Sequence, residues 1–253
     1  MTVWEALAIT AAGFVAGGVN TVVGSGSLVT FPTLVALGYP SVTANVSNTV
    51  GLVPGGASGI VGYRRELRGS WRRAAILGIG TTAGAIVGGI LLLSLPSAVF
   101  DAVVPVLILL AVALMARRPA PSAPSAPSAR AASRDRMAPA LVGAFLTGIY
   151  GGYFGAAQGI ILLAVLRLCF DQDLQLLNGI KNVLSAVANL VAAVLFIAVA
   201  HIAWGPALLI AIGSVFGAQV GARYGRRLPQ EVLRRIVVVG GTIVALILFA
   251  RLL

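Results

Sequence analysis

The feature that most constrains this chain is a series of uninterrupted apolar runs. Several are about 20 residues long, the length at which a helix spans the hydrocarbon core of a bilayer. A transmembrane barrel would alternate apolar and polar residues instead. A soluble domain of 253 residues would need more polar surface than a chain that is 58% hydrophobic and 10% charged provides. The runs therefore predict an all-α fold, a polytopic bundle of transmembrane helices.

Polar breaks and basic connections divide the first half of the chain into segments. We expect helical pieces at residues 6–23, 28–37, 41–63, 74–93 and 98–116. The first two are separated by the break at 24–27 and together are too short for two full spans. They predict a broken or re-entrant helical hairpin, whereas the other three segments are long enough to cross a bilayer.

Residues 117–137 form a segment without apolar periodicity. Their Pro/Ala/Ser repeat is typical of an extended tether, and the arginines within it predict a cytoplasmic location. We therefore expect two transmembrane repeats, residues 1–116 and 138–253, joined by a cytoplasmic linker.

The two halves resemble each other at a shift of 131 to 134 residues. At a shift of 133 there are six identities: Trp71 and Trp204, Gly80 and Gly213, Gly84 and Gly217, Gly88 and Gly221, Leu95 and Leu228, and Pro96 and Pro229. At 131, Phe14 meets Phe145, Gly17 meets Gly148 and Gly24 meets Gly155, and at 134 Asn48 meets Asn182. Each half is therefore predicted to contain one hairpin followed by three spans.

The arginines predict that the two halves have opposite orientations. In the first half, residues 64–73 and 117–136 are basic and the turn at 94–97 is uncharged, so the basic loops are expected in the cytoplasm. In the second half, the equivalent of that turn, 223–235, is basic, and the equivalent of the first basic loop, 200–203, carries no fixed charge. Such inverted repeats are typical of secondary transporters, whose substrate sites lie near the bilayer midplane where broken helices meet.

Polar residues inside the apolar runs gather at equivalent places in the two halves. They are Asn20, Ser25 and Ser27, with Gly24 and Gly26 between them, at the first break, Asn45, Ser47 and Asn48 in the span after it, Gln158 at the second break, and Asn178, Lys181, Asn182 and Ser185 in the following span. Helix N-termini offer unpaired N–H groups and a partial positive charge. Two breaks that face each other therefore predict a binding site for a small anion.

Lys181 is the single lysine among 18 basic residues, and it lies near the start of an apolar span. A lysine at the centre of a transmembrane helix costs about 2.5–3.5 kcal/mol on insertion scales, so it needs compensation. One interpretation is that Lys181 snorkels to the cytoplasmic interface. The other is that it faces the pocket and pairs with an anionic substrate. The asparagines are likewise open to two interpretations, as substrate ligands or as hydrogen-bonding contacts between helices.

Glycines at a spacing of four residues predict close helix contacts. They form the series Gly51/Gly55/Gly59, Gly80/Gly84/Gly88 and Gly213/Gly217/Gly221.

Enzymatic, metal-binding and nucleic-acid-binding functions are not expected. Residues 56–59 match the short GxSG pattern of rhomboid-type proteases, but the predicted topology places Ser58 and the single histidine, His201, near opposite membrane surfaces. The single cysteine and the peripheral carboxylates predict no metal site and no cofactor. The net charge of +11 is carried by short connections without interleaved aromatic residues, so it indicates membrane orientation rather than a nucleic-acid partner.

The two-repeat layout, the signature from Gly24 to Pro32, and the runs 44–48 and 178–183 resemble the TauE/SafE sulfite-exporter family of bacterial inner-membrane permeases. The resemblance implies transport, in the export direction, of a small sulfur-containing anion such as sulfite or an organosulfonate by alternating access. A passive anion channel and a non-transporting membrane assembly partner are the alternatives. The oligomeric state, including a homodimer, is left open.

Overall fold

A computed structural model describes residues 1–116 and 136–225. Within them lie the helices α1 (Val3–Val22), α2 (Ser27–Ala36), α3 (Ser41–Gly62), α4 (Trp71–Ser94), α5 (Ser97–Ala116), α6 (Met137–Tyr153), α7 (Gln158–Cys169), α8 (Leu174–Val199) and α9 (Trp204–Tyr224). The all-α prediction is confirmed, and the predicted segments of the first half agree with α1 to α5 to within three residues at each end. Most of the predicted linker and the last predicted span fall outside the described residues.

The surface of the bundle is that of a membrane protein. By length and composition, α1, α4, α8 and α9 are each able to cross a bilayer. Large apolar side chains point outward from them: Ile79 is 71% exposed on α4 and Phe216 is 64% exposed on α9. Trp71 and Trp204, which begin α4 and α9, are about half exposed, as expected of interfacial residues. The chain is a polytopic transmembrane helical protein.

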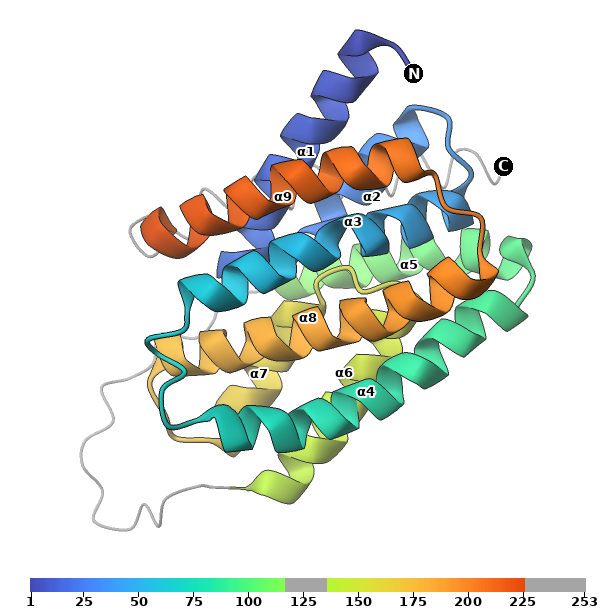
Figure 1. Cartoon of the computed structure of the whole chain (residues 1–253). Coiled ribbons are helices and arrows are strands. Elements are labelled where there is room, and N and C mark those ends of the chain that lie inside the picture. Colours follow the sequence, from blue (N-terminus) through green and yellow to red (C-terminus); the bar gives the residue numbers. More distant parts are fainter. Residues whose placement is uncertain (117–135, 226–253) are drawn as a thin grey trace, which may run out of the picture.

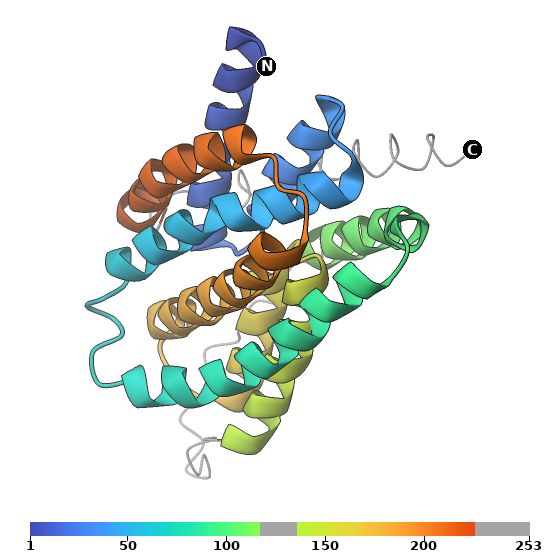
Figure 2. The ribbon, with the colours of Figure 1, turned by 45° about the vertical axis from the view of Figure 1, so that its right-hand side comes forward.

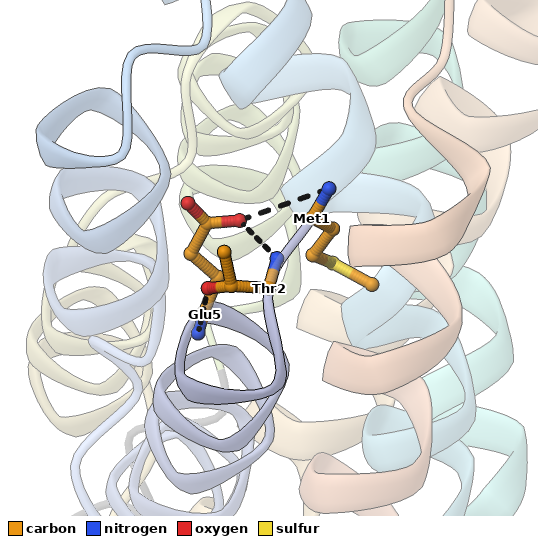
Figure 3. Close-up of polar contacts among 3 residues, drawn as sticks. All are labelled: Met1, Thr2 and Glu5. Carbon is orange, nitrogen blue, oxygen red and sulfur yellow. Dashed lines mark hydrogen bonds and ion pairs between the residues drawn. The ribbon is translucent and has the colours of Figure 1, made fainter.

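Helix α1 starts at a capping box (Figure 3). The Thr2 hydroxyl accepts from the Glu5 N–H at 3.3 Å, and the Thr2 N–H donates to Glu5 Oε2 at 2.7 Å. The terminal ammonium of Met1 lies 3.9 Å from the same carboxylate oxygen. These contacts satisfy the first backbone donors and place a negative charge at the positive end of the helix.

The two helical hairpins enter the bundle from opposite ends (Figures 1 and 2). The chain N-terminus and the α2–α3, α4–α5 and α8–α9 connections lie at one end. The α3–α4 and α7–α8 connections and the start of α6 lie at the other, which we call the basic end because Arg64 to Arg73 are there. The hairpin α1–α2 opens toward the first end and α6–α7 toward the basic end, so their breaks meet inside. This arrangement agrees with an inverted repeat, whose orientation in a membrane stays a prediction.

Helix packing crosses between the two halves of the sequence. Helix α1 packs along α9, and α4 packs along α6, so the first helix of each half lies against the fourth helix of the other. Helices α3 and α8 pair with each other and also with α9 and α4, respectively. Two packing groups result, one of α1, α2, α3 and α9 and the other of α4, α6, α7 and α8, with the α3–α8 contact between them.

Glycines make the closest of these contacts, as predicted. A Cβ at Gly217 of α9 would lie 1.8 Å from the Phe14 carbonyl oxygen, and one at Gly84 of α4 would lie 2.0 Å from that of Phe145. Since Gly84 and Gly217, and Phe14 and Phe145, are matched by the sequence repeat, equivalent residues make equivalent contacts. The predicted role of the glycine series in helix packing is confirmed. The predicted matches at Leu228 and Pro229 lie outside the described residues.

Candidate functional site

The first break is a tight turn between α1 and α2. Gly24 has φ +89°, a left-handed conformation that glycine adopts without steric cost, and its N–H donates to the Val19 carbonyl at 3.1 Å. Helix α2 then begins at Ser27. The turn therefore satisfies part of the C-terminus of α1 and directs the N-terminus of α2 into the bundle.

The second break has a similar turn between α6 and α7. Gly155, the repeat equivalent of Gly24, also has positive φ (+72°). Ala157 is left-handed as well, at φ +59°, which costs about 1–2 kcal/mol for a residue with a Cβ. The hydroxyl of the partly buried Tyr150 donates to the Ala156 carbonyl and holds the strained turn in place. Helix α7 begins at Gln158, with its N-terminus directed inward.

The two breaks contact each other directly. The Gly159 N–H donates to the Gly24 carbonyl at 2.9 Å. A Cβ at Gly24 would lie 2.4 Å from Gly159 Cα, so only glycine allows this approach. The prediction that the two breaks face each other is in agreement with this contact.

Lys181 lies beside the contact between the breaks and is fully buried. Its ammonium donates to the carbonyls of Asn20 (3.3 Å) and Thr21 (3.2 Å), the last turn of α1. The side chain does not snorkel to a surface, and the C-terminal carbonyls of α1 partly compensate its charge. Among the described residues, no carboxylate lies within ion-pair distance of it.

Other polar groups of the site have unused hydrogen-bonding capacity. Gln158 is buried, and its amide nitrogen has no hydrogen-bond partner among the described residues. The amide oxygen of Asn178 and the hydroxyl of Ser185 are also buried and have no partner in this part of the chain. Asn178 and Ser185 lie one turn before and one turn after Lys181 on α8. Asn182 donates to the Thr21 carbonyl at 3.1 Å. Buried polar groups without protein partners are uncommon in native proteins, so these groups are candidate hydrogen-bonding partners for water or a solute.

The first hairpin is joined to α3 by Asn48. Its amide nitrogen donates to the Ser27 hydroxyl at 3.2 Å, and its amide oxygen accepts from the Thr30 hydroxyl. Asn45, one turn earlier, donates to the Tyr153 carbonyl at the end of α6 at 3.0 Å. Both predicted asparagines of α3 thus hold the ends of the hairpins.

Not every predicted residue is brought to the breaks. The Ser47 hydroxyl accepts from the Ala203 N–H at 2.9 Å, which places it at the α8–α9 connection. Ser25 and Gly26 are buried within the first turn, and Asn20 contributes its carbonyl to Lys181.

Three residues of the site were not predicted from the sequence. Thr30 lies one turn after Ser27 on α2, and its hydroxyl in an apolar helix is a signal that the pattern contained. Thr21 contributes a backbone carbonyl, which no side-chain pattern identifies, and Tyr150 acts within its own turn.

The protease-like residues have other roles. The Ser58 hydroxyl donates to the Val215 carbonyl at 2.9 Å, and Gln219 donates to Ser58 Oγ at 2.8 Å, so this serine joins α3 to α9. His201 lies in the α8–α9 connection at the opposite end of the bundle.

A family model described as "Sulfite exporter TauE/SafE" matches residues 9–248. The chain belongs to the TauE/SafE family. A probable membrane transporter protein, ORF9, of Sinorhizobium sp. is 25% identical over 94% of this chain and 90% of its own length. A probable membrane transporter protein of Haemophilus influenzae is 26% identical over 90% of this chain and 88% of its own length. The probable membrane transporter protein YfcA of Escherichia coli K12 is 25% identical over 94% of this chain and 86% of its own length. No solved structure matches.

Membership of the TauE/SafE family identifies the chain as a membrane transporter, and its apolar helices make it a multi-pass protein of the bacterial inner membrane. A transporter of this family needs a solute site inside the bundle. The breaks bring together the N-termini of α2 and α7, each with a partial positive charge, and the ammonium of Lys181. The chemistry of this arrangement favours a negatively charged solute.

Proposed function

We propose that this TauE/SafE protein transports a small sulfur-containing oxyanion, such as sulfite or an organosulfonate, out of the cell by alternating access. The observation that carries the proposal is Lys181, a fully buried ammonium whose described partners are two backbone carbonyls and no carboxylate. A buried charge is stable when it is paired, and an anionic substrate would supply the missing counter-charge.

The proposed binding position is beside the contact of the two breaks. Among the described residues, the amide nitrogen of Gln158 has no hydrogen-bond partner and the Lys181 ammonium uses two of its three N–H groups. The hydroxyl of Ser185, also without a partner there, lies one turn after Lys181 on α8. An oxyanion accepts several hydrogen bonds at once, and bonds to charged donors are the stronger ones. Ser25 and Ser27 of the first hairpin, together with Asn48 of α3, are proposed to complete the site as the hairpins move.

The helix packing supports alternating access between the two packing groups. Close glycine contacts fix α1 to α9 and α6 to α4 within each group. The bonds from Lys181 and Asn182 to Thr21, and from Gly159 to Gly24, cross between the groups. An anion that binds Lys181 competes with the Thr21 carbonyl for its ammonium, which weakens the contact and allows the groups to separate.

The membrane potential favours export. With a negative interior, each elementary charge is worth about 2.3 kcal/mol per 100 mV, so a dianion leaving the cell gains about 4.6 kcal/mol. A coupling ion is then not required. We propose transport without covalent chemistry, since the breaks present hydrogen-bond donors and a cation.

The experiment is uptake and efflux of radiolabelled sulfite in proteoliposomes that contain the purified protein. Saturable flux above that of protein-free vesicles, competed by an organosulfonate, is the expected result. Flux equal to that of protein-free vesicles for both compounds would reject the substrate class. Single-channel currents in place of saturable flux would identify a passive anion channel.

A further inference from the structure

A second polar site lies at the basic end of the bundle, where α3 and α9 finish. A cavity of about 580 Å³ is bounded there by Arg64, Arg65 and Arg223, together with Glu66 and Gln219. Three arginines against one glutamate give these side chains a net charge of +2. The volume holds a small oxyanion with several water molecules, since one water occupies about 30 Å³.

Membrane orientation alone accounts for arginines at this end but not for their arrangement. Arg68, Arg72 and Arg136 are exposed at the same end, as the three arginines of the cavity also are, but they do not border it. Arginines near helix C-termini also interact with the helix dipole, which requires no concave surface. The arginines that line the cavity come from two different elements, the α3–α4 connection and α9. Guanidinium groups bind oxyanions with two parallel hydrogen bonds.

Helix α3 connects the floor of the cavity with the central site. Gly62 and Ala222 line it, and a Cβ at Gly62 would lie 2.3 Å from that of Ala222, so small residues close the cavity at this point. Gly59, one turn below Gly62 on α3, approaches Thr21, since a Cβ there would lie 2.9 Å from the Thr21 hydroxyl. The Thr21 carbonyl in turn accepts from Lys181. One helix therefore runs from the arginine cavity to the last turn of α1, where Lys181 is bound.

A wall of the cavity is held by hydrogen bonds. Gln219 donates to the Ser58 carbonyl at 2.9 Å and to its hydroxyl at 2.8 Å, which joins α9 to α3 just inside the cavity. Two other cavities, beside α4 and α8 and beside α1 and α9, are lined mainly by apolar side chains. The basic cavity differs from these in both its charge and its position at the end of the bundle.

We propose that the cavity bounded by Arg64, Arg65 and Arg223 is a second binding site for a free oxyanion, where the solute is held before it moves to Lys181. Its role in transport rests on the function proposed above. Its binding of oxyanions does not, and the test separates the two. The phosphate of an anionic lipid has similar chemistry and is the competing ligand.

The test measures thermal stabilisation of the purified full-length protein in a neutral, lipid-free detergent by sulfite, with inorganic sulfate and phosphate as further probes. The background is Lys181→Met, which removes the central cation, so that the remaining stabilisation reports the arginine cavity. The cavity variant is Arg64→Gln/Arg65→Gln/Arg223→Gln. The matched control is Arg68→Gln/Arg72→Gln/Arg136→Gln, which removes the same charge from the same end.

We expect saturable oxyanion stabilisation in the Lys181→Met background. The half-saturating concentration should rise about tenfold or more in the cavity variant, equivalent to about 1.4 kcal/mol, and change less than about twofold in the control. An equal loss in both triple variants would overturn the proposal, because it would report surface charge alone. Stabilisation by phosphatidylglycerol with none by the free anions would overturn it in favour of a lipid site. If the triple variant does not purify, Arg64→Gln and Arg223→Gln are measured singly against Arg68→Gln.

This experiment is independent of the transport assay. Oxyanion binding that depends on the cavity arginines, in a protein that fails to transport sulfite, would uphold the second site and reject the proposed substrate. Sulfite transport with no arginine-dependent binding would reject the second site and uphold the proposed substrate.

Discussion

Replacing Lys181 with methionine removes the charge of the site but keeps an unbranched side chain of similar length. The ammonium is fully buried and is shared between the carbonyls of Asn20 and Thr21. Losing one partner of a buried charge pair typically costs about 2–5 kcal/mol, which corresponds to about a 30- to 4,000-fold loss of affinity. We therefore expect sulfite flux in Lys181→Met to fall by at least about 30-fold at low substrate concentration.

Folding stability should respond far less than transport. Lysine costs about 2.5–3.5 kcal/mol at a helix centre, while each hydrogen bond of a charged group returns about 1.5–3 kcal/mol. Two bonds therefore roughly balance the cost, and the thermal midpoint of Lys181→Met should stay within a few degrees of the wild type. A large loss of flux with little change in thermal stability therefore distinguishes a substrate-binding lysine from one that only holds α1.

The assay is initial-rate sulfite flux in proteoliposomes, with thermal unfolding of the same preparations. Arg72→Met removes an equal charge from the exposed start of α4 and serves as the control, with flux expected near that of the wild type. Full flux of every anion tested in Lys181→Met would refute the argument. A collapse of thermal stability with no change in flux per folded molecule would show that Lys181 acts as a structural cap for α1.

Three further substitutions, the first with a matched control, test the packing that supports the site. Gly217→Ala should destabilise the fold by about 1–3 kcal/mol in a thermal unfolding assay, because the new Cβ would lie 1.8 Å from the Phe14 carbonyl oxygen. Gly78→Ala is the control: a Cβ there would meet open space, so the substitution should be neutral or stabilising in the same assay. Gly24→Ala should be more harmful still, since it combines positive φ with a backbone clash, and normal expression and flux would contradict the direct contact of the breaks. Asn48→Ala should cost about 1–3 kcal/mol through two lost side-chain bonds, and an unchanged unfolding temperature would show that these bonds contribute little.

The helices of this protein were predictable because apolar run length determines what can cross a bilayer. The turns at Gly24 and at its repeat equivalent Gly155 were also accessible, since glycines and polar residues interrupt an apolar run at each place, and both glycines have positive φ. The glycine contacts followed from spacing alone. Their partners did not, because a row of glycines shows that a helix approaches a neighbour but not which neighbour.

The site was predictable in its residue types and less so in its bonds. Burial of Lys181 and the asparagines follows from the cost of placing polar groups against lipid. The partners of Lys181 are backbone carbonyls, which every residue carries, so no sequence pattern distinguishes Thr21 from its neighbours. Ser47 was predicted to belong to the site and does not reach it. At the shift of 134 residues it is the repeat equivalent of Lys181, yet its hydroxyl accepts from the Ala203 N–H at the α8–α9 connection. Equivalent positions in a repeat share a backbone environment more reliably than a chemical role.

The two packing groups that are proposed to move during transport are not the two repeats seen in the sequence. The repeat boundary separates residues 1–116 from the second half, but the glycine contacts join α1 to α9 and α4 to α6 across that boundary. A movement that separated the sequence halves would break the closest backbone contacts in the bundle. A movement between the two packing groups leaves those contacts intact and changes the α3–α8 pairing and the bonds at Thr21 and Gly24. The lysine proposed to bind the substrate lies at that boundary, where occupation by an anion has its largest effect on how the groups are held together.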